Sequence, residues 1–93
     1  GTITAATSSS ISDGAAALVL MRASTARARG LAPVAVVRAH AVHAQAPAWF
    51  STAPAGAIRK VLQKTGWSVR DVDLWEINEA FAAVTMAAMT DFE

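Results

Sequence analysis

Three polar residues capable of chemistry lie close together, between apolar stretches, near the end of the sequence. Asn78 has Glu76 two residues before it and Glu79 directly after it. The preceding segment, 72–77, alternates as a strand does, and the following segment, 79–89, is apolar nearly all round, as in a buried helix. Asn78 is therefore expected at the carboxyl end of a strand, the edge at which α/β sheets bind ligands.

Two interpretations of Asn78 are open at this point. Asn is a favoured helix N-cap, and Glu79 in the first turn would suit the positive end of the helix dipole. Alternatively, the side-chain amide, which both donates and accepts hydrogen bonds, takes part in catalysis. Glu76 is interpreted as a partly buried acid held by its neighbours rather than as a catalytic group.

The rest of the chain alternates strand-like and helical patterns, which predicts an α/β fold. The apolar run at 15–21 is typical of a strand buried on both faces, or of a buried helix turn. Ser24 is expected to cap a short helix that Gly30 ends. Strands are thus expected at 15–21, 34–39 and 72–77, and helices at 24–30, 54–65 and 79–89.

The segment that begins at Pro54 carries the clearest helical pattern. Pro54 suits a first helical turn, where a missing N–H costs nothing, and Gly66 is expected to end the helix. The loop at 43–54, which has two prolines and no periodicity, is the best candidate for a domain boundary. One face of the helix is expected to carry Ile58, Val61, Leu62 and Thr65, and the other Arg59, Lys60, Gln63 and Lys64.

Composition narrows the classes of function. The chain has 93 residues, of which 54% are hydrophobic and 16% charged, with a net charge of +1 and no Cys. The near-neutral charge gives no support for a nucleic-acid or anionic-membrane partner, and no apolar run approaches a transmembrane length. High apolar content, no initiator Met and no helix stop at the end predict a segment of a larger protein. A cytoplasmic location is the default, since no export signal is visible.

The two histidines suggest a metal or base, but their surroundings do not support one. His40 and His43 are three residues apart near an expected strand end, without a Cys or an acidic cluster beside them. Because a metal site needs three or four ligands, we interpret both as ordinary surface or strand-end histidines and expect no metal site.

The stretch "INEAFAA" at 77–83 resembles the Asn-Glu-Ala-Phe block of thiolases, enzymes that join or cleave acyl-CoA thioesters at the β-keto position. Residues 1–21 and 31–47 also resemble thiolase segments, in the family's order and spacing. The resemblance is greatest to acetyl-CoA acetyltransferases. It implies a layered α-β-α-β-α fold of two similar halves. Residues 1–43 would end the N-terminal half, and residues 44–93 would form the linker and the start of the C-terminal half.

The resemblance also implies roles for individual residues. Asn78 matches the Asn that holds a water for the oxyanion hole of the thioester oxygen. Ser9 matches the Ser that hydrogen-bonds the pantetheine arm of CoA, with Ala5 and Ser8 as neighbouring backbone contacts. Phe50, at a position where many thiolases have Met, and Phe81 would line the channel. The coenzyme A thioester is expected as substrate, without a tightly bound cofactor. The complete protein is expected to be a homo-oligomer, either dimer or tetramer.

Departures from the family limit what this segment can do. Thr7, Ser10 and Ser12 stand where the family usually has Asn, Gly and Asn, residues that tolerate positive φ more easily. The family's two catalytic Cys and its Gly-His-Pro block are absent from these residues, so the segment alone is expected to be inactive. Two alternatives are an acyl-CoA or lipid-binding protein without catalysis, and a packing or interaction module in which Asn78 is only a cap.

Overall fold

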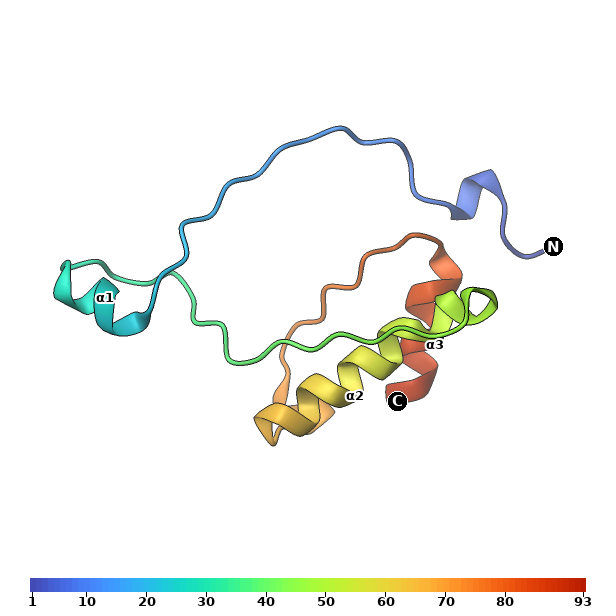
Figure 1. Ribbon diagram of the computed structural model, residues 1–93. Coiled ribbons are helices and arrows are strands. Elements are labelled where there is room, and N and C mark those ends of the chain that lie inside the picture. Colours follow the sequence, from blue (N-terminus) through green and yellow to red (C-terminus); the bar gives the residue numbers. More distant parts are fainter.

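The computed structural model describes residues 1–93 and consists of helices joined by long irregular segments (Figure 1). None of the helices has both the length and the apolar character needed to cross a membrane. The α-helices are α1 (Ala23–Ala28), α2 (Ala53–Thr65) and α3 (Ala82–Phe92), and the 3-10 helices are η1 (Ala5–Thr7), η2 (Pro47–Thr52) and η3 (Val69–Asp71).

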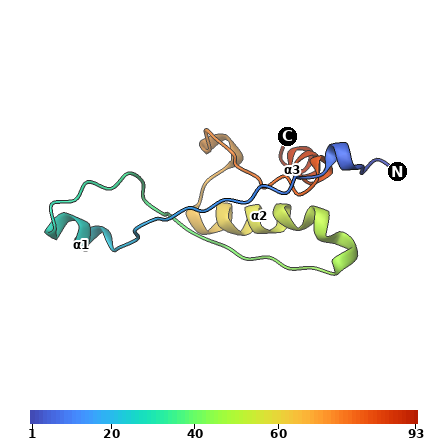
Figure 2. The same cartoon turned by 90° about the horizontal axis from the view of Figure 1, so that it is seen from above.

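Packing is confined to one end of the molecule. Helices α2 and α3 and the short helix η2 contact one another, whereas α1 lies at the far end of a long excursion of the chain (Figures 1 and 2). The radius of gyration is 16.7 Å, against about 13 Å for a compact domain of 100 residues. Only four residues are buried, and three of them, Ala55, Val84 and Ala88, belong to the α2 and α3 helices.

Helix α2 forms as its sequence predicts. Pro54 lies in its first turn, and Gly66 follows its last residue with φ of 71°, the left-handed conformation that glycine adopts without strain. The expected apolar face is partly buried and the expected polar face exposed. Two lysines on the polar face also donate hydrogen bonds to the preceding segment: Lys60 to the Val42 carbonyl at 3.1 Å and Lys64 to the His40 carbonyl at 2.8 Å.

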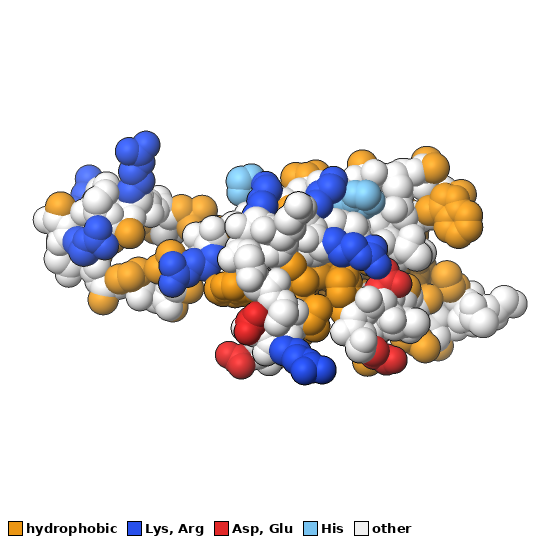
Figure 3. All heavy atoms as spheres, turned by 90° about the horizontal axis from the view of Figure 1, so that it is seen from below, with side chains coloured by type: hydrophobic (Ala, Val, Ile, Leu, Met, Phe, Trp, Pro, Cys, Tyr) orange, Lys and Arg blue, Asp and Glu red, His pale blue; other side chains and the backbone are white.

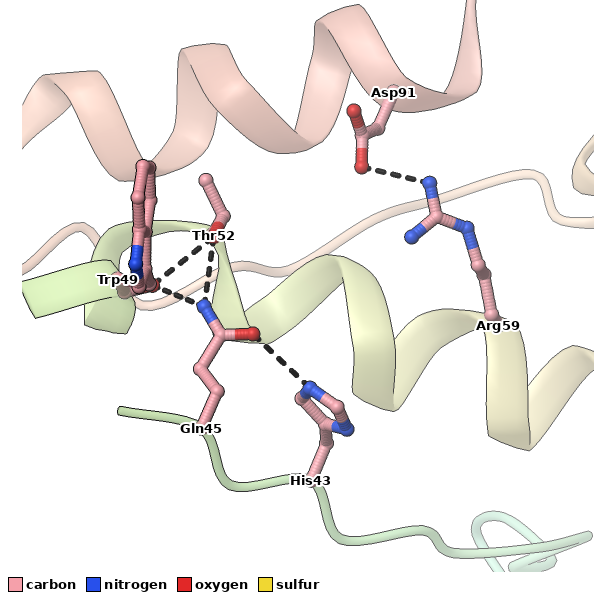
Figure 4. Close-up of polar contacts among 6 residues, drawn as sticks. All are labelled: His43, Gln45, Trp49, Thr52, Arg59 and Asp91. Atoms are coloured by element: carbon pink, nitrogen blue, oxygen red, sulfur yellow. Dashed lines mark hydrogen bonds and ion pairs between the residues drawn. The ribbon is translucent and has the colours of Figure 1, made fainter. Parts of the chain in front are cut away.

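One arginine links α2 to α3. The guanidinium of Arg59 forms an ion pair with Asp91 at 2.8 Å (Figure 4) and lies 5.4 Å from the centre of the Phe92 ring. The Phe92 ring in turn stacks on Trp75, with ring centres 6.4 Å apart. An exposed ion pair contributes only about 0–1 kcal/mol, so the aromatic and aliphatic contacts provide most of the attraction between these elements.

The predicted strands do not form a sheet, and the α/β layering is therefore not present in these residues. The segments 15–21, 34–39 and 72–77 have no regular secondary structure, and the first is exposed rather than buried, with Leu18 at 86%. Only an isolated antiparallel bridge between Ser8 and Phe81 occurs. A strand needs a neighbouring strand for its hydrogen bonds, and these segments do not lie beside one another.

Two helix starts also differ from expectation. Helix α1 begins at Ala23 with Arg22 as its N-cap residue, so Ser24 lies inside the helix and does not cap it. Helix α3 begins at Ala82 with Phe81 as its N-cap residue, three positions after the start that the apolar pattern suggested. Periodicity identifies a helix more reliably than it identifies the first residue.

The exposed apolar surface predicts how these 93 residues behave in isolation. Figure 3 shows hydrophobic side chains open to solvent, and Met86 and Met89 of α3 are 64% and 58% exposed. Because large exposed apolar patches drive association, we expect a peptide of residues 1–93 to aggregate. Light scattering and sedimentation measure this directly. A monomeric peptide that melts cooperatively would contradict the prediction.

Candidate functional site

Two segments far apart in the sequence meet at the start of α3. Ser8 and Phe81 form the antiparallel bridge, and the Ser9 backbone N–H donates to the Ala80 carbonyl at 3.1 Å. These contacts bring two residues expected to touch CoA, Ser8 and Ser9, next to the segment that contains Asn78. Ala5 lies in η1 just before them and is exposed.

Hydroxyl groups close the turn that precedes Ser9. The Thr4 N–H donates to Oγ1 of Thr7 at 2.9 Å, and Oγ of Ser8 donates to the Thr4 carbonyl at 2.7 Å. No residue other than glycine has a positive φ anywhere in the chain. The side-chain bonds of Thr7 and Ser8 therefore shape this turn without the positive φ that Asn or Gly would permit.

Phe81 joins three parts of the site. Its backbone is extended, with φ of −143° and ψ of 148°, as its bridge to Ser8 requires. Its ring packs edge-to-face against Phe50 of η2, with centres 6.0 Å apart. Because an extended residue cannot belong to the helix, α3 begins only at Ala82. The structure thus contradicts the interpretation of Asn78 as the N-cap residue.

A cavity of about 460 Å³ collects several of the candidate residues. Asn78 and Glu76 line it from the segment before α3, Phe50 lines it from η2, and Ala57 lines it from α2. Asn78 is exposed, and its backbone carbonyl accepts the Ala80 N–H at 3.0 Å. The cavity therefore combines an apolar wall with a polar amide, the composition expected of a small-molecule site.

His43, to which the sequence analysis gave no functional role, also lines this cavity. His43 is partly buried, and its ring lies so close to Gly56 of α2 that a Cβ added there would overlap it. Its Nε2 is 3.1 Å from Oε1 of Gln45 (Figure 4). The sequence indicated an ordinary surface or strand-end histidine and did not place His43 at this cavity. The only signal in the sequence was a glycine inside a helix, which often marks a close approach.

Glu76 is the only acidic residue that lines this cavity, and it is exposed rather than partly buried as the sequence analysis interpreted it. The backbone N–H and hydroxyl of Ser68 lower the pKa of Asp71, which lies in η3 and does not line the cavity. No group of three or more His, Cys, Asp or Glu residues is placed to hold a metal ion. The arrangement is suited to binding a largely apolar ligand with a few hydrogen bonds.

Comparison with known proteins identifies the class. Residues 31–93 match the family described as thiolase, C-terminal domain. The chain is 45% identical over 93 residues to a 3-ketoacyl-CoA thiolase of Marinobacter nauticus, with all of the chain and 24% of the relative covered. It is 46% identical over 91 residues to an acetyl-CoA acetyltransferase of Paracoccus denitrificans (98% and 23% covered). It is 49% identical over 87 residues to a mitochondrial acetyl-CoA acetyltransferase of Danio rerio (94% and 21% covered).

The chain belongs to the thiolase family. It spans about a quarter of the length of the relatives that it matches. The resemblance stated from "INEAFAA" and the preceding segments is therefore confirmed at the level of the family, with relatives that carry both the 3-ketoacyl-CoA thiolase and the acetyl-CoA acetyltransferase names.

The contact between His43 and Gly56 predicts an unusual response to a helix-stabilising substitution. Replacing a helical Gly with Ala normally stabilises by about 0.5–1 kcal/mol. Here the new methyl group would overlap the imidazole, so we expect Gly56→Ala to lose that gain or to destabilise the protein. Denaturant unfolding of a full-length thiolase that carries this chain measures the effect.

The matched comparison is the same change in a His43→Ala background. With the ring removed, the usual stabilisation by Gly56→Ala should return, and the two substitutions should be non-additive. In a His40→Ala background, where the lost ring is an exposed one, Gly56→Ala should behave as it does in the parent. Equal stabilisation in all three backgrounds would show that His43 does not rest on Gly56.

Proposed function

We propose that this chain is part of an acyltransferase of the thiolase type, which condenses two acetyl-CoA molecules or cleaves a 3-ketoacyl-CoA by transfer of acyl groups between thioesters. The observation that carries the proposal is the meeting of residues 8–9 with residues 78–81, beside a cavity that Asn78 and Phe50 line. These are the residues for which the family resemblance implies contact with the CoA thioester.

In this proposal the reaction consists of two half-reactions. A Cys thiolate, supplied by other residues of the protein, attacks a thioester carbonyl and takes the acyl group, and the first CoA thiol leaves with a proton. A base supplied by other residues of the protein then removes a proton from the α-carbon of a second thioester. That carbon attacks the acyl-enzyme carbonyl, so that a C–C bond forms while the C–S bond to Cys breaks and the thiolate is regenerated. Each transfer passes through a tetrahedral species whose oxygen carries negative charge, and hydrogen-bond donors directed at that oxygen lower the barrier.

Asn78 supplies a donor to this charge through a water molecule. An Asn side-chain amide can donate two hydrogen bonds and accept two, so it can hold a water in a fixed orientation toward the thioester oxygen. The open cavity at Asn78 and the engagement of its backbone carbonyl by Ala80 support this role, because the backbone is fixed while the side chain remains accessible.

The segment around Ser9 binds the pantetheine arm. Its backbone N–H donates to the Ala80 carbonyl, which places the Ser9 backbone near the start of α3. Ala5 and Ser8 add neighbouring backbone contacts, and the packed rings of Phe50 and Phe81 provide an apolar wall. No tightly bound cofactor is needed in this scheme, because CoA enters and leaves as a substrate.

Three broader proposals accompany this function. The complete protein is a homo-oligomer, a dimer or tetramer, and the chain spans the end of one thiolase half (1–43) and the start of the other (44–93) in a layered α-β-α-β-α fold. A cytoplasmic location stays a prediction, since one relative is named as mitochondrial. The resemblance to thiolases supports the first two of these proposals.

Asn78→Asp tests the catalytic role. The change replaces an amide with a carboxylate that only accepts hydrogen bonds, and it puts negative charge beside a developing oxyanion. Loss of a direct oxyanion donor costs roughly 10²–10³ in rate, and a water-mediated donor less. We therefore expect kcat of the full-length enzyme to fall by at least about tenfold, measured by steady-state kinetics, with little change in melting temperature.

The neighbouring carboxylate gives the control. Glu79→Gln alters the charge next to Asn78 but leaves its amide in place, so it should change kcat far less. Full activity of Asn78→Asp would remove this residue from the oxyanion hole. Since Asn78 does not cap α3, loss of a helix cap could not explain a reduced rate.

Ser9→Ala tests the binding of the arm. Removal of one neutral hydrogen bond costs about 1 kcal/mol, and we expect a several-fold rise in KM with kcat almost unchanged, because the pantetheine arm is the same in ground and transition states. Ser10→Ala is the matched control, since the Ser10 hydroxyl is bonded only to Ser12, at 2.9 Å. Equal KM values for Ser9→Ala and the parent would show that Ser9 does not contact the substrate.

A further inference from the structure

The family resemblance assigns no role to His43, yet this residue shares the cavity with Asn78 and Phe50. We infer that His43 is a specificity-determining residue whose imidazole limits the size of the acyl group that the site accepts. This inference rests on the proposed function, because it takes the reacting thioester to lie at Asn78. A group bound there must fit between Asn78 and the opposite walls of the same cavity.

Two contacts fix the position of the imidazole ring. Gly56 has no side chain, so the ring lies directly against the backbone of α2, where any Cβ would overlap it. The other contact is the bond of 3.1 Å between Nε2 and Oε1 of Gln45. Figure 4 shows the Gln45 side chain between the histidine ring and the η2 segment.

The orientation of the Gln45 amide follows from its other partners. Its Nε2 faces the Trp49 carbonyl, which can only accept, and Oγ1 of Thr52 at 2.7 Å. Thr52 directs its own proton at the Trp49 carbonyl, 3.0 Å away, and so accepts from Gln45. Both amide protons are therefore engaged, and Oε1 is the atom that meets His43.

An acceptor at Oε1 requires a proton on Nε2 of His43. In the neutral ring Nδ1 is then the acceptor, and the ring has one defined tautomer and one orientation. The Gly56 backbone and Oε1 of Gln45 both hold the ring, so it cannot move away from a bulky ligand as a free side chain can. A rigid wall of this kind makes a cavity selective by size, since rejection depends on a clash that the protein does not relieve.

The expected preference is for short, unbranched acyl groups. In an apolar pocket, one methylene group changes selectivity by roughly 10–200-fold. We therefore expect His43→Ala, which removes the ring, to raise the kcat/KM for a 3-ketooctanoyl-CoA relative to that for acetoacetyl-CoA by about tenfold. The measurement is thiolysis of both substrates by the full-length enzyme, with free CoA as the second substrate.

His40→Ala is the matched control, because it removes an exposed imidazole three residues away and should leave the ratio unchanged. If His43→Ala does not fold, His43→Val gives a smaller apolar side chain at the same place and should move the ratio in the same direction. Gly56→Ala should change the ratio in the parent, by displacing the ring, but not in His43→Ala.

The outcomes separate this inference from the proposed function. An enzyme without thiolysis of either substrate would contradict the proposed function. An active enzyme whose selectivity ratio is the same with and without the His43 ring, or changes equally in His40→Ala, would overturn the inference alone.

Discussion

The contact between α2 and α3 is the constraint on which the site depends. Two of its three buried residues are alanines, Ala55 and Ala88, whose small side chains let two helix backbones approach closely, and the third is Val84. Helix α2 directly follows η2 and contains Gly56, against which the His43 ring packs. The segment that contains Asn78 precedes α3. Neither helix has a complete site of its own. The cavity exists because apolar packing holds the two segments at a fixed separation.

Phe81 determines how the third segment joins this pair. Phe81 forms the bridge to Ser8, is the last extended residue before α3, and packs its ring against that of Phe50. These requirements are compatible because an extended backbone exposes its N–H and C=O to one neighbour while its side chain points to another. A helical Phe81 would lose the bridge, and Ser9 would lose its position near Ala80. The late start of α3 is therefore a feature of the site.

The sequence predicts the parts of this structure that depend on local interactions. The α2 helix follows from the spacing of Ile58, Val61 and Leu62 and from the turn at Gly66, all of which act within a few residues. The strands were not predicted correctly, because β-branched composition reports a fit to a pleated surface and not the presence of a partner. The proximity of Ser9 to Ala80 could be reached only through the family resemblance. The sequence did not predict the contact between the His43 ring and Gly56, because periodicity does not report a contact between a loop and a helix.

The hydrogen bonds between the segments of Ser8 and Phe81 are too weak to hold these segments together by themselves. Their pairing closes a loop of roughly 70 residues, whose ends cost about 4 kcal/mol to bring together, and a hydrogen bond returns only about 1 kcal/mol. Contacts within the loop, chiefly those between α2 and α3, reduce this cost by shortening the free chain. A thioester that touched both Ser9 and Asn78 would bind only the paired arrangement and would stabilise it by mass action. In the proposed enzyme, substrate binding would therefore stabilise the pairing of residues 8–9 with residues 80–81.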